Sequence, residues 1–308
     1  MRIAVIGAGS LGCLFGARLA ANEHDVWLLH HRPEYVKQLL EHGVRIQSDY
    51  HSNTLEVDVP ATTTAGDIGP VDLVLVLVKA HHTKTAVRDH AACIGPETYV
   101  LSLQNGLRNY EYLIDLVGAE RALGGVTYQA AITDSPGEIQ HTSQGETIFG
   151  GQDHAFAERV RMVFEQAGFE TTVAEDPRHP IWDKQLLGLA TLPLAALTRL
   201  MVDNLMNDDG LEWIMHQLIA EARAVAEAHN IDLRTDDVLT SFQEMVGTYP
   251  SHKISMLQDI EYERKTEIDE LNGAIVDLAT EADVDVPINR TVTELVRSLE
   301  QSYLNQNS

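Results

Sequence analysis

The stretch IWDKQLLGLATLPLAAL, residues 181–197, places one lysine inside a run that is otherwise almost wholly apolar. Such a run is typical of a buried helix. Because a charged amine is costly to bury without a partner, Lys184 either extends along its own stem to solvent or lies in a site that supplies a partner and uses the amine. Burial lowers the pKa of a lysine from about 10.4 toward neutral pH, the range in which groups that exchange protons work best.

A second candidate is the glycine loop GAGSLG, residues 7–12. It follows the apolar strand pattern RIAVI and opens a helical pattern, which is the context that a dinucleotide-binding loop requires. Its three glycines permit a tight turn, close approach to a pyrophosphate and packing of helix on strand, while the helix N-terminus faces negative charge. The alternative is a plain turn. We expect a bound cofactor to contact Gly7, Gly9, Ser10, Leu11 and Gly12.

The end of the second predicted strand distinguishes NAD from NADP. An acidic residue there binds the ribose hydroxyls, whereas a basic residue accepts a 2′-phosphate. The strand DVWLL is followed by His30, His31 and Arg32, with no acidic residue before Glu34. The sequence therefore favours NADP, with His31 and Arg32 in the binding site. The alternative is that Arg32 only lies on the surface.

Polar residues also follow two later strand patterns. Lys79 ends VDLVLVLVK, and Asn105 with Gly106 ends YVLSLQNG. A doubly wound sheet binds its ligands at the carboxyl edge of the strands. Lys79 alone would equally fit a solvated loop, but two such ends beside the glycine loop indicate the nicotinamide side of the cofactor and the substrate.

The stretch SMLQDIEYERKTEIDELNG, residues 255–273, begins with a capping-box pattern formed by Ser255 and Gln258. It continues as a strongly charged helical pattern, and most of its charges fit a solvated face. Glu267 differs only if the fold brings it to Lys184, which spacing alone does not show.

Composition limits the class of protein. The 308 residues fit two domains of ordinary size and contain only two cysteines, so we expect a reducing, cytoplasmic environment. No secretory signal pattern opens the chain, and its apolar runs are too short to span a membrane. The net charge is −24, with 46 acidic against 22 basic residues, which argues against nucleic acid as a partner. Histidine pairs at 30–31 and 81–82 lack a carboxylate or cysteine cluster, so no metal site is expected.

Strand and helix patterns alternate in the first half and predict an N-terminal Rossmann-type, doubly wound parallel sheet. The expected strands are 2–6, 25–29, 71–79, 99–106, 122–131, 147–149 and 171–174, and the expected helices are 12–21, 34–42 and 155–167. The second half predicts an all-helical domain, with helices at 182–200, 208–229, 235–247, 255–283 and 288–304. Pro177 and Pro180 mark the boundary. We therefore expect an NADP-binding domain over residues 1–177 and a helical substrate and catalytic domain over 178–308.

The sequence resembles the ketopantoate reductase (2-dehydropantoate 2-reductase) family along its whole length. The matching motifs are GAGSLG, VK at 78–79, LQNG at 103–106, Gly145 with FGG at 149–151, Trp182 with Lys184 and Pro193, SMLQD at 255–259, TEID with NG within 266–273, and VPIN at 286–289. The resemblance implies that the N-terminal domain binds NADPH, that the helical domain closes over it, and that a 2-oxo acid is reduced in the cleft.

The resemblance also implies roles for single residues. Lys184 matches the general acid that protonates the ketone oxygen as hydride arrives, and Glu267 matches a carboxylate that touches the substrate hydroxyl and steadies the lysine. Asn105 matches an amide beside the reacting centre, and Ser255 matches a serine that binds the substrate carboxylate. One unbroken helix over 255–267 would separate its ends by about 18 Å, too far to share a small acid. Either that helix bends or starts late, or one assignment is wrong.

This chain departs from the family on the lysine helix. Active members carry asparagines four and eight residues after the lysine, on its own face, where this chain has Gly188 and Leu192. Thr191 is the polar neighbour expected on that face, so we include it among the substrate-binding candidates. A more apolar pocket would suit a different 2-oxo acid and would lower the lysine pKa further.

Three functions follow from these observations. The first is NADPH-dependent reduction of ketopantoate in pantothenate and coenzyme A biosynthesis. The second is reduction of another branched or aromatic 2-oxo acid. The third is a non-catalytic nucleotide-binding sensor on the same fold, which loss of Lys184 or Glu267 would have favoured. The expected partner is a small 2-oxo acid. A homodimer is compatible with the sequence, which does not give the oligomeric state.

Overall fold

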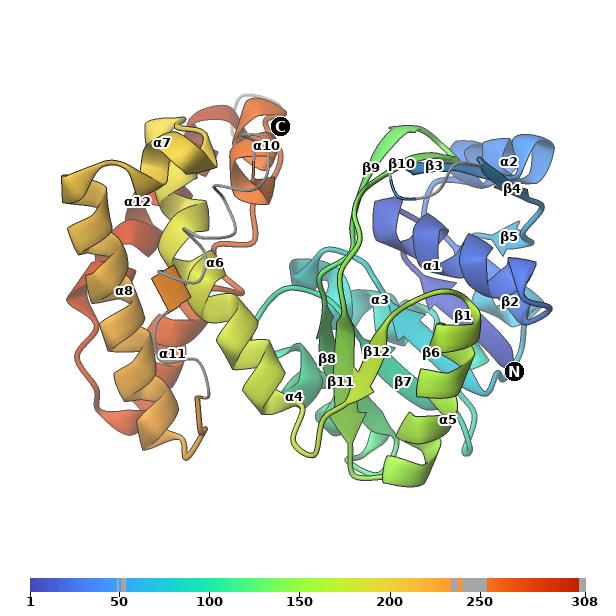
Figure 1. Cartoon of the computed structure of the whole chain (residues 1–308). Coiled ribbons are helices and arrows are strands. Elements are labelled where there is room, and N and C mark those ends of the chain that lie inside the picture. Colours follow the sequence, from blue (N-terminus) through green and yellow to red (C-terminus); the bar gives the residue numbers. More distant parts are fainter. Residues whose placement is uncertain (49, 51–53, 234–237, 240–253, 305–308) are drawn as a thin grey trace. The chain divides into compact units, whose positions relative to one another are not determined.

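The computed structural model describes residues 1–48, 50, 54–233, 238–239 and 254–304 (Figure 1). The chain divides into two compact units. The first comprises Met1–Gln104 and Asn109–Pro180, and the second comprises Asn105–Arg108 and Ile181–Ser308. The division after Pro180 falls shortly beyond the expected boundary at residue 177. The sequence did not indicate that the short segment Asn105–Arg108 belongs with the helical unit.

The first unit is built on an eight-stranded sheet of order β12-β11-β8-β7-β6-β1-β2-β5. Neighbouring strands are parallel except β11 against β8. The strands are β1 (Arg2–Ile6), β2 (Asp25–Leu29), β5 (Ala61–Thr62), β6 (Leu73–Val76), β7 (Tyr99–Ser102), β8 (Ala122–Thr127), β11 (Thr147–Gly151) and β12 (Thr171–Val173). The unit's helices are α1 (Ser10–Ala21), α2 (Pro33–His42), α3 (Thr83–Asp89), α4 (Asn109–Val117) and α5 (His154–Gln166). The predicted Rossmann-type fold is confirmed.

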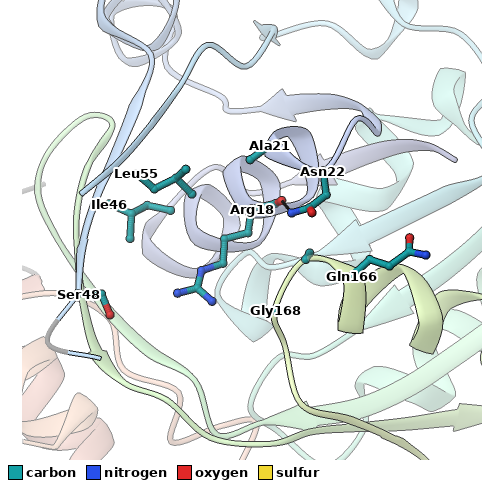
Figure 2. Close-up of a pocket in the computed structure, with 9 residues that line it drawn as sticks. Arg18, Ala21, Asn22, Ile46, Ser48, Leu55, Gln166 and Gly168 are labelled. Atoms are coloured by element: carbon teal, nitrogen blue, oxygen red, sulfur yellow. Dashed lines mark hydrogen bonds between the residues drawn. The ribbon is translucent and has the colours of Figure 1, made fainter. Parts of the chain in front are cut away.

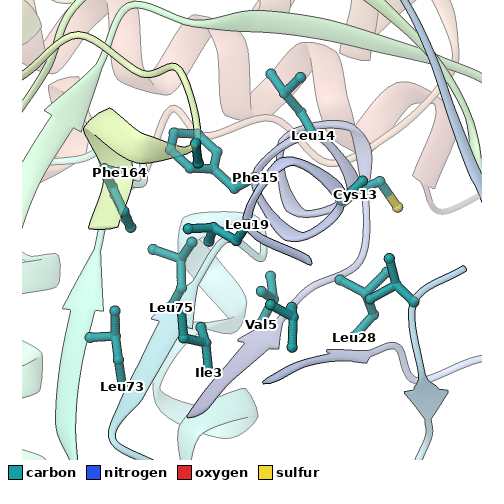
Figure 3. Close-up of a cluster of buried hydrophobic side chains, with 14 of the residues drawn as sticks. Ile3, Val5, Cys13, Leu14, Phe15, Leu19, Leu28, Leu73, Leu75 and Phe164 are labelled. Carbon is teal, nitrogen blue, oxygen red and sulfur yellow. The ribbon is translucent and has the colours of Figure 1, made fainter. Parts of the chain in front are cut away.

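The core of this unit lies between the sheet and its helices. Phe15 of α1 stacks on Phe169 with ring centroids 4.2 Å apart and meets Phe164 of α5 at 5.5 Å. Figure 3 shows Phe15 and Phe164 near Leu75 of β6. Burial of these large apolar side chains is the main contribution that holds α1 and α5 on the sheet.

A second sheet was not expected from the sequence. It has the order β4-β3-β10-β9, with β3 (Val44–Ser48), β4 (Leu55–Val57), β9 (Ala130–Ser135) and β10 (Glu138–Ser143). The single strand predicted over 122–131 is therefore wrong, because β8 ends at Thr127 and β9 begins a new hairpin. The hairpin turns at Gly137, whose φ of +85° favours glycine. Strand β9 is largely exposed, so it carries no continuous apolar signal.

The second unit is helical, as expected. Its helices are α6 (Arg178–Thr198, which begins in the first unit), α7 (Val202–Met206), α8 (Asp209–Ala228), α10 (Ser255–Glu261), α11 (Asn272–Ala282) and α12 (Pro287–Leu304). Apart from residues 238 and 239, the helix predicted at 235–247 lies outside the described residues. Over the ranges that the structure describes, no helix is long and apolar enough to cross a membrane.

The single helix predicted over 255–283 is wrong. Helix α10 ends at Glu261 and α11 starts at Asn272. Between them Glu263 adopts a left-handed conformation with φ of +53°, and the Thr266 N–H donates to Glu300 Oε1 at 2.6 Å. A left-handed residue ends a helix, and the Glu300 bond supplies a partner for an amide outside it. The distance objection to pairing Ser255 with Glu267 therefore does not apply.

Candidate active site

Lys184 has polar neighbours from distant parts of the chain. Its Nζ donates to Asn105 Oδ1 at 3.0 Å, and Asn105 Nδ2 approaches Glu267 Oε2 at 3.5 Å. The Glu267 side chain is buried, with 7% of the residue exposed. All three residues belong to the second unit. The lysine in the apolar helix therefore has a partner, and the expected neighbours Asn105 and Glu267 are brought together around it.

The surroundings shift the pKa of this amine. Burial disfavours the charged form and lowers the pKa of Lys184 to about 8, while the negative charge of Glu267 acts in the opposite direction. A group with a pKa near 8 is partly protonated at neutral and mildly alkaline pH. Such a group can both give and regain a proton.

Residues on either side of Asn105 in the sequence are hydrogen-bonded to other segments. On one side the amide of Gln104 accepts from Ser102 Oγ at 2.9 Å and donates to the carbonyl of Val78 at 2.6 Å. On the other side the Leu107 N–H donates to the carbonyl of Glu270 at 3.2 Å. Gln104 is 6% exposed, so its hydrogen bonds act in a site with little water. This position of Gln104 was not predicted, although the motif LQNG follows the end of a strand.

Helix α6 is tied to the rest of its unit through a proline. Pro193 has no N–H, so the carbonyl of Leu189 lacks its helical donor. Asn272 Nδ2 donates to that carbonyl at 3.0 Å and to Asn289 Oδ1 at 3.0 Å. Asn289 Nδ2 in turn donates to Glu221 Oε2 at 2.8 Å. Asn272 and Asn289 are fully buried, so this network fixes α6 against α11, α12 and α8.

Ser255 and Thr191, the other two predicted substrate contacts, stay predictions. Ser255 is the first residue of α10 and Ile254 is the N-cap, so Ser255 does not occupy the cap position and the predicted capping box is wrong. Thr191 donates its hydroxyl to the carbonyl of Leu187 at 2.8 Å, which commits its proton to its own helix. Among the described residues, no hydrogen bond joins Ser255 or Thr191 to Lys184.

The glycine loop has the geometry that its sequence predicted. Gly7 has φ of +105°, and a Cβ there would lie 2.6 Å from the Val78 nitrogen. A Cβ on Gly12 would lie 2.0 Å from the carbonyl oxygen of Gly7. At Gly9 nothing lies within 4 Å of the Cβ position, so a ligand can approach the backbone closely. Ser10 begins α1 beside Leu11, and its hydroxyl lies 2.8 Å from Thr133 Oγ1.

Basic and aromatic groups gather at the end of β2. Arg32 Nε donates to His31 Nε2 at 3.3 Å, and the Arg32 N–H donates to His30 Nδ1 at 3.2 Å. The His30 ring stacks on Tyr35 with centroids 4.0 Å apart. Burial, Arg32 and His82 all lower the pKa of His31. Within the described ranges Arg32 has no ion pair with a carboxylate.

Lys79 follows β6 and directly precedes the 3₁₀ helix Ala80–His82, at the edge of the sheet where the parallel strands have their carboxyl ends.

A cavity of about 280 Å³ lies elsewhere in the first unit, by the last turn of α1. Figure 2 shows the Arg18 side chain among the residues that line it. None of the predicted site residues lines this cavity. The described part of the chain also contains no group of three or more residues suited to bind a metal.

Comparison with known proteins gives the family. The model of ketopantoate reductase PanE/ApbA matches residues 3–154, and the model of its C-terminal domain matches residues 176–300. The chain is similar to the 2-dehydropantoate 2-reductase of Halobacterium salinarum, with 34% identity over 96% of this chain and 98% of that protein.

Two solved structures extend the likeness. The PanE/ApbA family ketopantoate reductase from Ralstonia eutropha JMP134 has 31% identity and a TM-score of 0.91, covering 99% of this chain and 100% of the other. D-mandelate dehydrogenase with NADH and anilino(oxo)acetate has 25% identity and a TM-score of 0.91, covering 98% and 99%. With two family models spanning most of its length and relatives matched almost end to end, the chain belongs to the ketopantoate reductase family.

Proposed function

We propose that the protein reduces 2-dehydropantoate to pantoate with NADPH, a step of pantothenate and coenzyme A biosynthesis. This proposal rests on the surroundings of Lys184. The lysine lies in the apolar helix α6, hydrogen-bonds to Asn105 beside Glu267, and has its pKa lowered to about 8. Family membership supplies the substrate class, since relatives such as that of Halobacterium salinarum are named for this reaction.

Lys184, Asn105 and Glu267 have different roles in the proposed reaction. A bound nicotinamide supplies the hydride that reaches the carbonyl carbon. Lys184 donates a proton to the ketone oxygen, so the 2-oxo acid gains one hydride and one proton and becomes a 2-hydroxy acid. Asn105 Oδ1 accepts one of the three N–H bonds of the ammonium group and thereby orients the others. The charge of Glu267 keeps the lysine protonated before transfer.

We assign the cofactor to the N-terminal part of the chain, over residues 1–177, and the substrate to the helical part, over residues 178–308. The related D-mandelate dehydrogenase structures contain NADH, which supports a nicotinamide cofactor. The preference for NADPH rests on Arg32 and His31, because a 2′-phosphate would meet a guanidinium without a carboxylate partner among the described residues.

Replacement of Arg32 tests this preference. We expect Arg32→Ala to raise KM for NADPH about 10-fold and to leave KM for NADH nearly unchanged, because a charge-assisted hydrogen bond to the 2′-phosphate is lost. Arg88→Ala, at the end of α3, serves as a surface control. Equal effects on the two cofactors would remove Arg32 from the phosphate site.

A second candidate function is reduction of another branched or aromatic 2-oxo acid. Gly188 and Leu192 replace two amides on the lysine face and make it more apolar. The similar D-mandelate dehydrogenase was solved with anilino(oxo)acetate, whose name denotes an aromatic oxo acid.

NADPH oxidation by the purified protein against a panel of 2-oxo acids separates these functions. We expect ketopantoate to give the highest kcat/KM, and Lys184→Ala to lower kcat about 10² to 10⁴-fold because the proton donor is lost. Glu267→Ala should also impair turnover, and Lys37→Ala on exposed α2 is the control. Faster turnover of another acid favours the second function. NADPH binding without turnover of any acid favours a sensor.

A further inference from the structure

An amide side chain lies at the edge of the face of α6 that carries Lys184. At about 100° per residue, Gly188 and Leu192 lie about 40° and 80° around the helix from Lys184, and Gln185 lies about 100° from it. Gln185 therefore borders the same stripe. The stripe thus has an amide at its edge although neither Gly188 nor Leu192 provides one.

The Gln185 side chain reaches over the glycine. A Cβ built on Gly188 would lie 3.4 Å from Gln185 Oε1 and 3.4 Å from Leu192 Cδ1. An asparagine at position 188 would have to share this space with the Gln185 amide. The absence of a side chain on Gly188 leaves room for the Gln185 amide beside it.

The Gln185 amide lacks a protein partner for its donor end. Only 2% of the residue is exposed, and within the described part of the chain Nε2 has no hydrogen-bond acceptor. A buried donor without an acceptor destabilises a fold, so such groups are rare and call for an explanation. Packing does not supply one, because an apolar side chain of similar size would fill the space without this cost.

We propose that Gln185 determines substrate specificity by taking the place of the asparagine amide missing at position 188 and hydrogen-bonding an oxygen of the 2-oxo acid. This inference rests on the proposed function. The unpaired donor is kept because the substrate satisfies it, and the ketone and carboxylate oxygens of a 2-oxo acid are acceptors of the required kind. The otherwise apolar surface beside Leu192 would then contact the carbon skeleton of the substrate.

Steady-state kinetics and thermal unfolding of Gln185→Leu test the inference. We expect KM for the preferred 2-oxo acid to rise about 10-fold, which corresponds to about 1.4 kcal/mol of lost binding. KM for NADPH should stay unchanged. The Tm should be equal or higher, because the unpaired donor is removed. Leu186→Met, a buried change on the opposite side of α6, should leave both KM values unchanged.

A second pair of variants tests whether an amide at position 188 can replace the amide of Gln185. Gln185→Ala should raise KM for the 2-oxo acid, and adding Gly188→Asn to it should lower that KM again, because the vacated space accepts the new amide. A lower Tm for Gln185→Leu with unchanged KM, or no recovery in the double variant, would show that the amide serves only packing. If the wild-type protein reduces no 2-oxo acid, the proposed function fails as well. If the wild type is active and these variants match it, only this inference fails.

Discussion

The glycine loop of the first unit and the lysine cluster of the second unit are organised in opposite ways. Gly7, Gly9 and Gly12 lie within one short segment, and their backbone conformations and missing side chains form the site. Lys184 and Asn105 are 79 residues apart, and Asn105 and Glu267 are 162 residues apart. A local site survives changes elsewhere that keep its own segment intact, whereas the lysine cluster depends on the packing of several helices.

The largest effect should appear within the glycine loop. Gly12→Ala would place a Cβ 2.0 Å from the backbone oxygen of Gly7, so we expect a loss of about 3 kcal/mol in the free energy of unfolding. Gly9→Ala meets no atom within 4 Å and should leave unfolding unchanged while weakening NADPH binding about 10-fold. Denaturant unfolding and NADPH titration measure the two effects. Similar unfolding curves for both variants would contradict the division of roles.

The next largest effect concerns the hydrogen bond from Asn272 that holds α6 against α11. Asn272→Ala removes the donor to the Leu189 carbonyl and should lower the free energy of unfolding by about 2 kcal/mol. Pro193→Ala restores an N–H that can bond this carbonyl within the helix. The cost of Asn272→Ala should therefore be about 1 kcal/mol smaller when residue 193 is alanine. Strictly additive costs would mean that the proline and the asparagine do not act through the same carbonyl.

The smallest expected effect is the change of kcat/KM with each pH unit. Reduction needs protonated Lys184, so kcat/KM should be constant below pH about 8 and fall tenfold per pH unit above it. Oxidation of the hydroxy acid needs the neutral amine and should rise through the same range. A profile for reduction that stays flat well above pH 8 would remove Lys184 as the proton donor.

The same group affects folding. The pKa of Lys184 is lowered from 10.5 to about 8 in the folded state, so the unfolded chain binds more protons between these values. Stability should therefore rise with pH across this window, and the full cost of burying the charge is present below it. Lys184→Met should flatten this part of the stability profile.

Strand and helix assignments from sequence succeeded where burial was continuous. Strands β1 and β2 have the predicted bounds because each is an unbroken, mostly apolar run. The β9–β10 hairpin was missed because much of β9 faces solvent. The break between α10 and α11 was missed because its charged residues also suit a helix, and the turn at Glu263 depends on tertiary contacts such as that of Thr266 with Glu300.

The candidate site shows the same limit. Motifs identified Lys184, Asn105 and Glu267 individually, but the supporting amides of Gln104 and Asn272 were not recognised. Their roles depend on carbonyl groups contributed by Val78 and Leu189, and nothing in the sequence marks a carbonyl as lacking a donor except the proline at 193. Hydrogen-bond partners across long sequence separations arise only from packing.

The sequence by itself determined the glycine loop, the parallel sheet that carries it and the helical character of the second unit, because backbone preference and apolar periodicity act over a few neighbouring residues. Only the tertiary structure decided whether the buried amine has a partner. The stabilisation of a charge depends on the distance to groups that folding brings together from far along the chain, and residue type does not encode that distance.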